Sequence, residues 1–139
     1  MPTNRTFTMI KPDAFADGHT GAMIQQIEEA GFKLKSARLL KMSSDQAGQF
    51  YAVHSERPFY NDLRNYMSSG PILAMVLEKE NAVADFRKLI GATDPSKAEE
   101  GTIRKRFARS IEANAIHGSD SDENAAIEAG FFFSQLDVV

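Results

Sequence analysis

Residues 114–120 read Asn-Ala-Ile-His-Gly-Ser-Asp, and this segment is the most informative stretch of the chain. It places the imidazole of His117 beside a glycine, the hydroxyl of Ser119 and the carboxylate of Asp120, with the amide of Asn114 three residues upstream. Gly118 has no Cβ, so the backbone can turn tightly and a ligand can approach the ring. The segment indicates a nucleophile or a ligand site. A lone histidine is more often structural, so this interpretation needs support from the rest of the sequence.

The composition predicts a single globular domain that covers residues 1–139, because the chain is 42% hydrophobic and 25% charged and is long enough to bury a core. It has no apolar run of bilayer length, and its first residues lack the apolar stretch of a signal peptide. We therefore expect a cytoplasmic protein without membrane contact. The absence of cysteine excludes disulfides and thiolate sites. The net charge of -3 argues against nucleic-acid binding, which usually needs a basic face.

Four segments have the pattern of β-strands. Polarity alternates over Arg5–Ile10 and at the start of Phe32–Met42, whereas Ile72–Leu77 is a nearly continuous apolar run, typical of a buried central strand. Pro12 ends the first strand, because proline cannot continue a paired central strand. A short last strand is expected over Asn114–Ile116.

Helical spacing or helix boundaries mark five further segments. Gly31 and Gly91 follow two of them, where a C-terminal cap is expected, and Ser43 or Ser44 can cap a third. The polar loop at 92–101 is long enough to be functional or mobile. The order of elements predicts an α/β or α+β protein but fixes neither strand order nor direction. The predicted helices are Gly21–Ala30, Ser44 to about His54, Phe59–Met67, Asn81–Ile90 and Asp122–Phe133.

The common phosphate-binding loops and metal motifs are missing from the sequence. Ser96 stands where a P-loop beginning at Gly91 would need its second glycine, and no Gly-x-Gly-x-x-Gly occurs. The three histidines, at 19, 54 and 117, are not at metal-ligand spacing, so we expect no zinc site.

Three cations lie in or beside loops and could together bind an anion. Lys11 follows the first strand, Arg87 lies late in a predicted helix, and Arg104 comes at the end of the long loop. Each alone is more often a solvated charge. Arginine suits phosphate because its planar fork donates two hydrogen bonds at once.

Two aromatic side chains could contact a ligand: Phe59, directly after Pro58, and Tyr51, on the preceding helix. Phe59, at a helix start, is either a core residue or a face for stacking a nucleobase, and stacking tolerates any base. Tyr51, on the preceding helix, could offer its hydroxyl to the same ligand.

Two carboxylates near the last helix also have alternative interpretations. Glu128 shares a small, apolar helix face with Ala125, Ala129 and Phe132, which predicts partial burial and therefore a partner. The nearest candidate is the His117–Ser119 turn; alternatively, Glu128 faces solvent. Asp120 could simply cap the last helix.

Together these residues make the chain resemble the nucleoside diphosphate kinase family. The resemblance covers nearly the whole length, and Asn-x-x-His-Gly-Ser-Asp at 114–120 is its most specific motif. The other matching segments keep the family's order and spacing: Thr6–Asp13, Arg57–Tyr60, Ser69–Val76, Gly91–Pro95 and Gly101–Arg104.

This resemblance decides the fold that periodicity leaves open. It implies an α+β, ferredoxin-like βαββαβ core with a four-stranded antiparallel sheet covered by helices. Alternation of strands and helices alone would favour a parallel sheet. It also implies that a helical hairpin at about 43–68 and a long loop at 92–113 form the two walls of a nucleotide cleft.

The family's activity implies a phosphotransferase that works by a ping-pong cycle with Mg²⁺. His117 would attack the γ-phosphorus of a nucleoside triphosphate and pass the phosphoryl group, as a phosphohistidine, to a nucleoside diphosphate. An imidazole is largely neutral near pH 7 and needs no general base, and positioning and charge neutralisation dominate phosphoryl transfer.

The resemblance also implies roles for individual residues. Phe59 would stack on the base with Ile111 on its other side, and Asn114 would bind the ribose 3′-hydroxyl. Glu128 and Ser119 would fix the imidazole, and Asp120 would contact Mg²⁺ through water, the ion being carried mainly by the nucleotide phosphates. The phosphates would be held by Lys11, Arg87, Thr93 and Arg104.

Departures from the family's pattern are few. Lys105-Arg106 replaces an acidic residue of many relatives, and Asp94 and Glu100 replace a common asparagine and proline. These changes bear on stability and on subunit contacts in a homo-oligomer built from dimers, either a hexamer or a tetramer. An alternative function is a nucleotide-binding regulatory or scaffold protein of the same fold, which the intact Lys11, Asn114 and His117 argue against.

Overall fold

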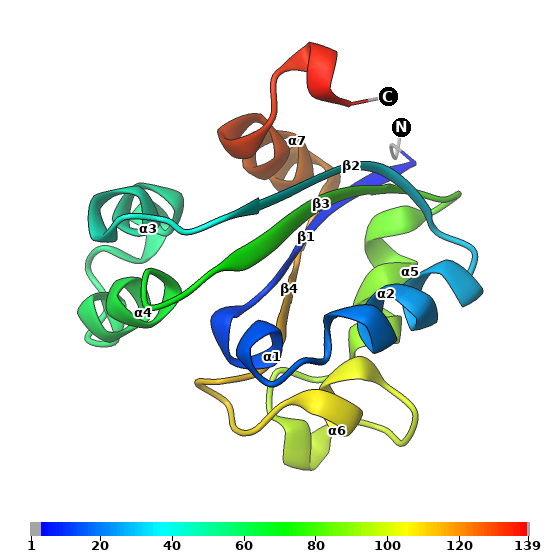
Figure 1. The fold of residues 1–139 in the computed structure, drawn as a ribbon, viewed down its shortest axis with the longest axis horizontal. Helices are drawn as coiled ribbons and strands as arrows, with labels where there is room; N and C mark the ends of the chain where they lie inside the picture. Colours follow the sequence, from blue (N-terminus) through cyan, green and yellow to red (C-terminus); the bar gives the residue numbers. More distant parts are fainter. Residues whose placement is uncertain (1–3, 139) are drawn as a thin grey trace.

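The computed structural model describes residues 4–138 as one layered α+β arrangement around a single sheet (Figure 1). Short 3₁₀ turns at Ala52–His54, Pro95–Lys97 and Gln135–Asp137 complete the secondary structure of this region. The strands and α-helices follow in the order β1 (Arg5–Ile10), α1 (Pro12–Ala16), α2 (Thr20–Glu29), β2 (Lys33–Leu40), α3 (Ser44–Phe50), α4 (Tyr60–Met67), β3 (Ile72–Glu78), α5 (Ala82–Ile90), α6 (Ile103–Phe107), β4 (Ile116–Gly118) and α7 (Asp122–Phe132).

The sheet has the strand order β2-β3-β1-β4, and every neighbouring pair is antiparallel. Because β1 and β2 both run antiparallel to β3, they run parallel to each other, with β3 between them. The same holds for β3 and β4, which β1 separates. The four-stranded antiparallel sheet is confirmed. Alternating strands and helices favour a parallel sheet only when the two strands of a β-α-β unit are neighbours, and here they are not.

Side chains alternate between the two faces of the sheet, and each face has its own core. Phe7 and Met9 of β1 pack with Phe132 of α7, whereas Ile10 packs with Phe86 of α5. Figure 1 shows α7 on one side of the sheet and α2 and α5 on the other. No helix within residues 4–138 is long and apolar enough to cross a bilayer.

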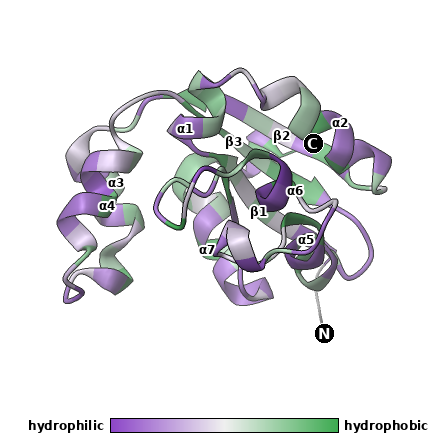
Figure 2. Ribbon diagram, turned by 90° about the horizontal axis from the view of Figure 1, so that it is seen from below, coloured by the Kyte–Doolittle hydropathy of each residue, from purple (hydrophilic) through white to green (hydrophobic). Residues whose placement is uncertain are grey.

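The α3–α4 hairpin projects from one end of the sheet, away from α5 and α6 (Figure 2). Its first helix begins with a complete capping box, in which Ser43 accepts from the Gln46 backbone and the Gln46 side chain accepts from Ser43. The Tyr60 hydroxyl donates to the Gly48 carbonyl at 2.8 Å and so fixes the two helices of the hairpin together.

The structure differs from the predicted elements where local capping competes with periodicity. Pro12 does end β1, but it also begins the unpredicted helix α1, since proline fits the first turn of a helix. The predicted loop beyond residue 101 contains α6, which Thr102 caps by accepting from the Lys105 backbone. The helix predicted to reach about His54 ends at Phe50, and a 3₁₀ turn follows.

The last strand is shifted from the predicted Asn114–Ile116 to β4 at Ile116–Gly118. Ala115 has φ 74°, which is outside the range of a strand, so pairing with β1 begins only at Ile116. His117 therefore lies within the strand, opposite Met9.

Gly118 of β4 packs closely against α5. A Cβ added there would lie 2.9 Å from Ile90 Cδ1 and 3.2 Å from Phe86 Cδ2. We expect Gly118→Ala to lower the free energy of unfolding by about 1–3 kcal/mol through overpacking. The matched change Gly130→Ala, on α7 with nothing within 4 Å, should raise it by about 0.5–1 kcal/mol. Urea unfolding followed by circular dichroism measures both, and equal effects would contradict the packing argument.

Candidate active site

His117 is held at the centre of β4 by backbone pairing and by two aromatic rings. The Thr8 hydroxyl donates to the His117 carbonyl at 2.6 Å, which fixes the strand against β1. The ring centroids of Phe7 and Phe50 lie 6.0 Å and 5.7 Å from the imidazole centroid. About a fifth of the His117 side chain, 19%, remains exposed, so the ring is constrained but reachable.

Glu128 and Ser119 fix the orientation of the imidazole. Nε2 of His117 lies 2.8 Å from Oε1 of Glu128, and the Ser119 hydroxyl donates to the same oxygen at 2.6 Å. A carboxylate can only accept, so Nε2 carries the hydrogen and the lone pair is on Nδ1. The expected contact between Glu128 and the 117–119 segment is present, and the alternative that Glu128 simply faces solvent is wrong.

Lys11 is a buried cation at the end of β1. It is 8% exposed, and its ammonium donates to Oδ1 of Asn114 at 2.7 Å. Burial, and secondarily the positive charge of Arg104, lowers the pKa of Lys11 to about 8, while Asp13 opposes this shift. Asn114 is neutral, so an anionic ligand would offset the cost of burying the ammonium far better than the amide does.

Arg104 brings a second buried cation to the segment that carries His117. Its guanidinium donates to the carbonyls of Gly91 at 3.0 Å and of Ile116 at 2.8 Å, and Ile116 directly precedes His117. Burial, with a smaller contribution from Arg87, lowers the pKa of Arg104 to about 10. Two cations are therefore held close together, and the positive charge of Arg104 lowers the pKa of Lys11 more than the Asp13 carboxylate raises it.

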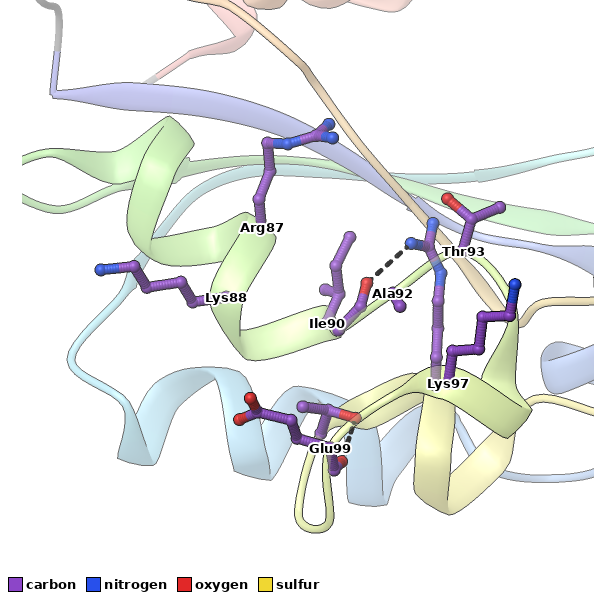
Figure 3. Close-up of a pocket in the computed structure, with 10 residues that line it drawn as sticks. Arg87, Lys88, Ile90, Ala92, Thr93, Lys97 and Glu99 are labelled. Carbon is purple, nitrogen blue, oxygen red and sulfur yellow. Dashed lines mark hydrogen bonds between the residues drawn. The ribbon is translucent and has the colours of Figure 1, made fainter.

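Arg104 also lines a pocket of about 600 Å³ at the C-terminal end of α5 (Figure 3). Arg87 and Thr93 line the same pocket, so three of the four predicted phosphate ligands share it. Figure 3 shows Lys97 extending towards Thr93, whereas Lys88 points away along the outer side of α5.

A second, more apolar cleft of about 570 Å³ lies between the α3–α4 hairpin and the loop after α6. Phe59 and Ile111 both line it and are 47% and 52% exposed. The interpretation of Phe59 as a core aromatic is therefore wrong. Thr93 belongs to both cavities and joins them. The predicted residues that this cleft brings together are Lys11, Tyr51, Phe59, Thr93, Ile111 and Asn114.

Tyr51 lies at the wall of this cleft with its side chain largely buried. Its hydroxyl has no hydrogen-bond partner within residues 4–138. Burial, together with the nearby Glu128 charge, raises the pKa of Tyr51, so the hydroxyl stays protonated and is available as a donor.

Asp120 is exposed and does not cap the last helix. Ser121 takes that position and accepts from the Asn124 backbone, whereas Asp120 accepts from the Asn124 side chain at 2.6 Å. Asp120 lines a shallow pocket together with Arg87. The interpretation of Asp120 as an N-cap is wrong.

Asp13 and Tyr66 contact the site but were not predicted from the sequence. The buried Asp13 carboxylate accepts from the Ala115 backbone at 3.1 Å and from the Tyr66 hydroxyl. Tyr66 also lines the cleft with Phe59. Local patterns could not reveal these contacts, because Asp13 lies 102 residues from Ala115 along the chain.

Comparison with known proteins identifies the chain. The sequence model of the family described as nucleoside diphosphate kinase matches residues 4–138. The chain belongs to the nucleoside diphosphate kinase family. The resemblance seen in the sequence is thereby confirmed, and the protein is a phosphotransferase.

Relatives of this nucleoside diphosphate kinase match over nearly the whole length. The enzyme of Flavobacterium psychrophilum is 60% identical over 134 residues, 96% of each chain. That of a Methylobacterium species is 54% identical and covers 100% of this chain and 99% of its own. The Aquifex aeolicus structure has a TM-score of 0.95 at 41% identity, covering 98% and 99%. The Halobacterium salinarum structure, in complex with CDP, has a TM-score of 0.92 at 34% identity, covering 99% and 91%.

The lowered pKa of Lys11 predicts how the stability of this nucleoside diphosphate kinase depends on pH. Between pH 8 and 10 the folded chain has lost the Lys11 proton while the unfolded chain keeps it, so the free energy of unfolding rises with pH. The contribution of this group is up to about 3 kcal/mol over that range. Urea unfolding of wild type and Lys11→Met at pH 8 and pH 10 measures it. An equal pH dependence in both proteins would contradict the assignment.

Proposed function

We propose that this nucleoside diphosphate kinase carries the transferred phosphoryl group on Nδ1 of His117. The observation that carries the proposal is the bond from Nε2 to Glu128, which leaves the lone pair on Nδ1 in a partly exposed ring. Nδ1 would form a bond to the γ-phosphorus of a nucleoside triphosphate as the bond to the leaving diphosphate breaks. The reverse step would transfer the group to a second nucleoside diphosphate, which gives a ping-pong cycle.

Glu128 and Ser119 would act by holding the ring through this cycle. The carboxylate keeps the hydrogen on Nε2 and compensates the positive charge that the ring acquires when Nδ1 bonds to phosphorus. Ser119 shares the same oxygen and so limits rotation of the carboxylate. A regulatory protein that does not transfer phosphate would have no use for this anchored ring.

The buried cations would bind the phosphates. Lys11 and Arg104 both bond to the segment before His117, where their side chains donate to the Asn114 amide oxygen and to the Ile116 carbonyl. Arg87 and Thr93 extend the same site along the pocket at the C-terminal end of α5. Phosphoryl transfer requires mainly positioning and charge neutralisation, which is what this arrangement provides.

The apolar cleft would bind the nucleoside. Phe59 and Ile111 would pack on the base, the Tyr51 hydroxyl would donate into the cleft, and Asn114 would contact the ribose 3′-hydroxyl. Stacking does not discriminate between bases, so both purine and pyrimidine nucleotides should bind. Binding of CDP by the Halobacterium salinarum protein supports this proposal.

Mg²⁺ would accompany the nucleotide. Mg²⁺ usually takes one or two protein carboxylates and completes its shell with phosphate oxygens and water. The exposed carboxylate of Asp120, which shares a pocket with Arg87, fits that mode as a contact through water. Within residues 4–138 no group of three or more potential ligands could hold a metal by itself. When bound, the ion would neutralise phosphate charge.

Location and assembly remain predictions. We propose a cytoplasmic homo-oligomer built from dimers.

Two of the departures from the family's pattern have local roles that leave the site intact. Asp94 accepts from the Ser96 backbone at 3.0 Å and begins a 3₁₀ turn, and Arg106 bonds to Gln26 of α2.

Incubation with γ-labelled ATP and Mg²⁺ tests the role of His117. We expect acid-labile, base-stable label in the wild type and none in His117→Ala. The matched control is His19→Ala, whose ring packs on Phe107 outside both cavities and which should label normally. Hydrolysis and separation of the two phosphohistidine isomers should place the phosphate on Nδ1. Label in His117→Ala, or phosphate on Nε2, would overturn the proposal.

Phe59→Ala tests the nucleoside cleft. The substitution should weaken binding of ATP, GTP and CDP alike by about 1–3 kcal/mol, while phosphohistidine still forms at saturating ATP. Calorimetric titration measures the affinities. Leu136→Ala, which removes a 91% exposed side chain that does not line the cleft, is the matched control. Unchanged affinity in Phe59→Ala would show that the ring does not contact the base.

A further inference from the structure

The backbone immediately before β4 adopts an unusual turn. Ala115 has φ 74°, and the Ile116 N–H donates to the Asn114 carbonyl at 2.9 Å. These features match the positive-φ form of the γ-turn, which is rare and strained. Alanine also pays a steric penalty at positive φ that glycine would not. The turn separates Asn114 from His117, so its shape determines where the Asn114 amide lies relative to the imidazole.

Both backbone polar groups of Ala115 are held by the segment that follows β1. The Lys11 N–H donates to the Ala115 carbonyl at 2.8 Å, and the Ala115 N–H donates to Oδ2 of Asp13 at 3.1 Å. Ala115 is fully buried, and Asp13 is only 4% exposed. A strained backbone persists only where its surroundings over-determine it. At Ala115 the only side chain that holds the backbone through such a bond within residues 4–138 is the Asp13 carboxylate, which accepts from the Ala115 N–H.

A third segment meets Asp13 from the cleft wall. The Tyr66 hydroxyl of α4 donates to the other carboxylate oxygen. Burial, together with this hydrogen bond, raises the pKa of Tyr66, so the hydroxyl remains a donor. Asp13 therefore joins α1, the turn before His117 and the wall that carries Phe59.

We propose that Asp13 is a positioning residue for phosphoryl transfer, acting by holding the γ-turn at Ala115. This inference rests on the proposed role of His117. Removal of the carboxylate leaves the Ala115 N–H buried without its acceptor. The turn then relaxes and shifts Asn114 and Lys11 relative to the imidazole. Such a shift slows transfer of the phosphoryl group more than it weakens nucleotide binding, because Phe59 and Ile111, which would hold the base, do not belong to the turn.

Single-turnover phosphorylation of His117 at saturating ATP and Mg²⁺, with the Kd for ADP measured in parallel, tests the proposal. Asp13→Ala should slow phosphorylation by about 10- to 100-fold, the cost of a small misplacement, with little change in Kd. Asp13→Asn should slow phosphorylation less than Asp13→Ala does, because the amide oxygen can still accept from the Ala115 N–H. Asp45→Asn is the matched control: its exposed carboxylate pairs with Arg64, and its rate should equal that of wild type.

Ala115→Gly provides the decisive comparison. Glycine adopts positive φ without penalty, so Asp13→Ala/Ala115→Gly should recover much of the rate lost in Asp13→Ala. If circular dichroism shows that Asp13→Ala is unfolded, Asp13→Asn and Asp13→Asn/Ala115→Gly make the same comparison. Asp13 variants that phosphorylate at the wild-type rate, or a double variant that recovers nothing, would overturn the proposal.

Varying the pH distinguishes the effect of the Asp13 charge on Lys11 from the effect of the Asp13 hydrogen bond to Ala115. Asp13 raises the pKa of Lys11, against burial and Arg104, which lower it. If Asp13→Ala is slow because Lys11 has become neutral, lowering the pH would restore the rate of phosphorylation and Ala115→Gly would not. That result would also overturn the proposal. A wild-type protein that takes up no label would instead refute the role of His117.

Discussion

Antiparallel pairing of β4 with β1 is the constraint on which the site depends. β1 is central in the sheet, and its register with β4 sets Met9 opposite His117. Lys11 directly follows β1 and Ala115 directly precedes β4, so the two residues lie side by side. The Lys11 N–H donates to the Ala115 carbonyl. Two segments that are distant in sequence thus supply one site, and a shift of register by one residue would turn His117 to the other face of the sheet.

Buried positive charge is the second property that defines the site. Lys11 and Arg104 are buried, and their main hydrogen-bond acceptors are an amide and two carbonyls. Burial disfavours the charged form of both groups, and their mutual repulsion adds to it at Lys11. The folded protein therefore holds positive charge where a polyphosphate would relieve it. This charge is local, since the chain as a whole carries -3.

Orientation of the nucleophile requires a different kind of support. The imidazole packs against Phe7 and Phe50, which also contact each other, and is anchored through Nε2 by Glu128. Helix α7 crosses the sheet face that carries Phe7, which brings Glu128 to the ring. The same helix therefore closes one core and sets the tautomer of the histidine.

The sequence by itself determined the four strands, the main helices, the cations and the motif around His117, because each has a local signature in periodicity, capping or residue order. The helix-face argument also predicted the partner of Glu128. Periodicity left the strand directions open and the resemblance to the family supplied the antiparallel sheet, whereas only the tertiary structure decided the shift of β4, the exposure of Phe59 and the position of Asp13. These features depend on contacts between residues far apart in the chain. Pairing energy and burial act between such segments only once the chain has folded, so no local pattern encodes them.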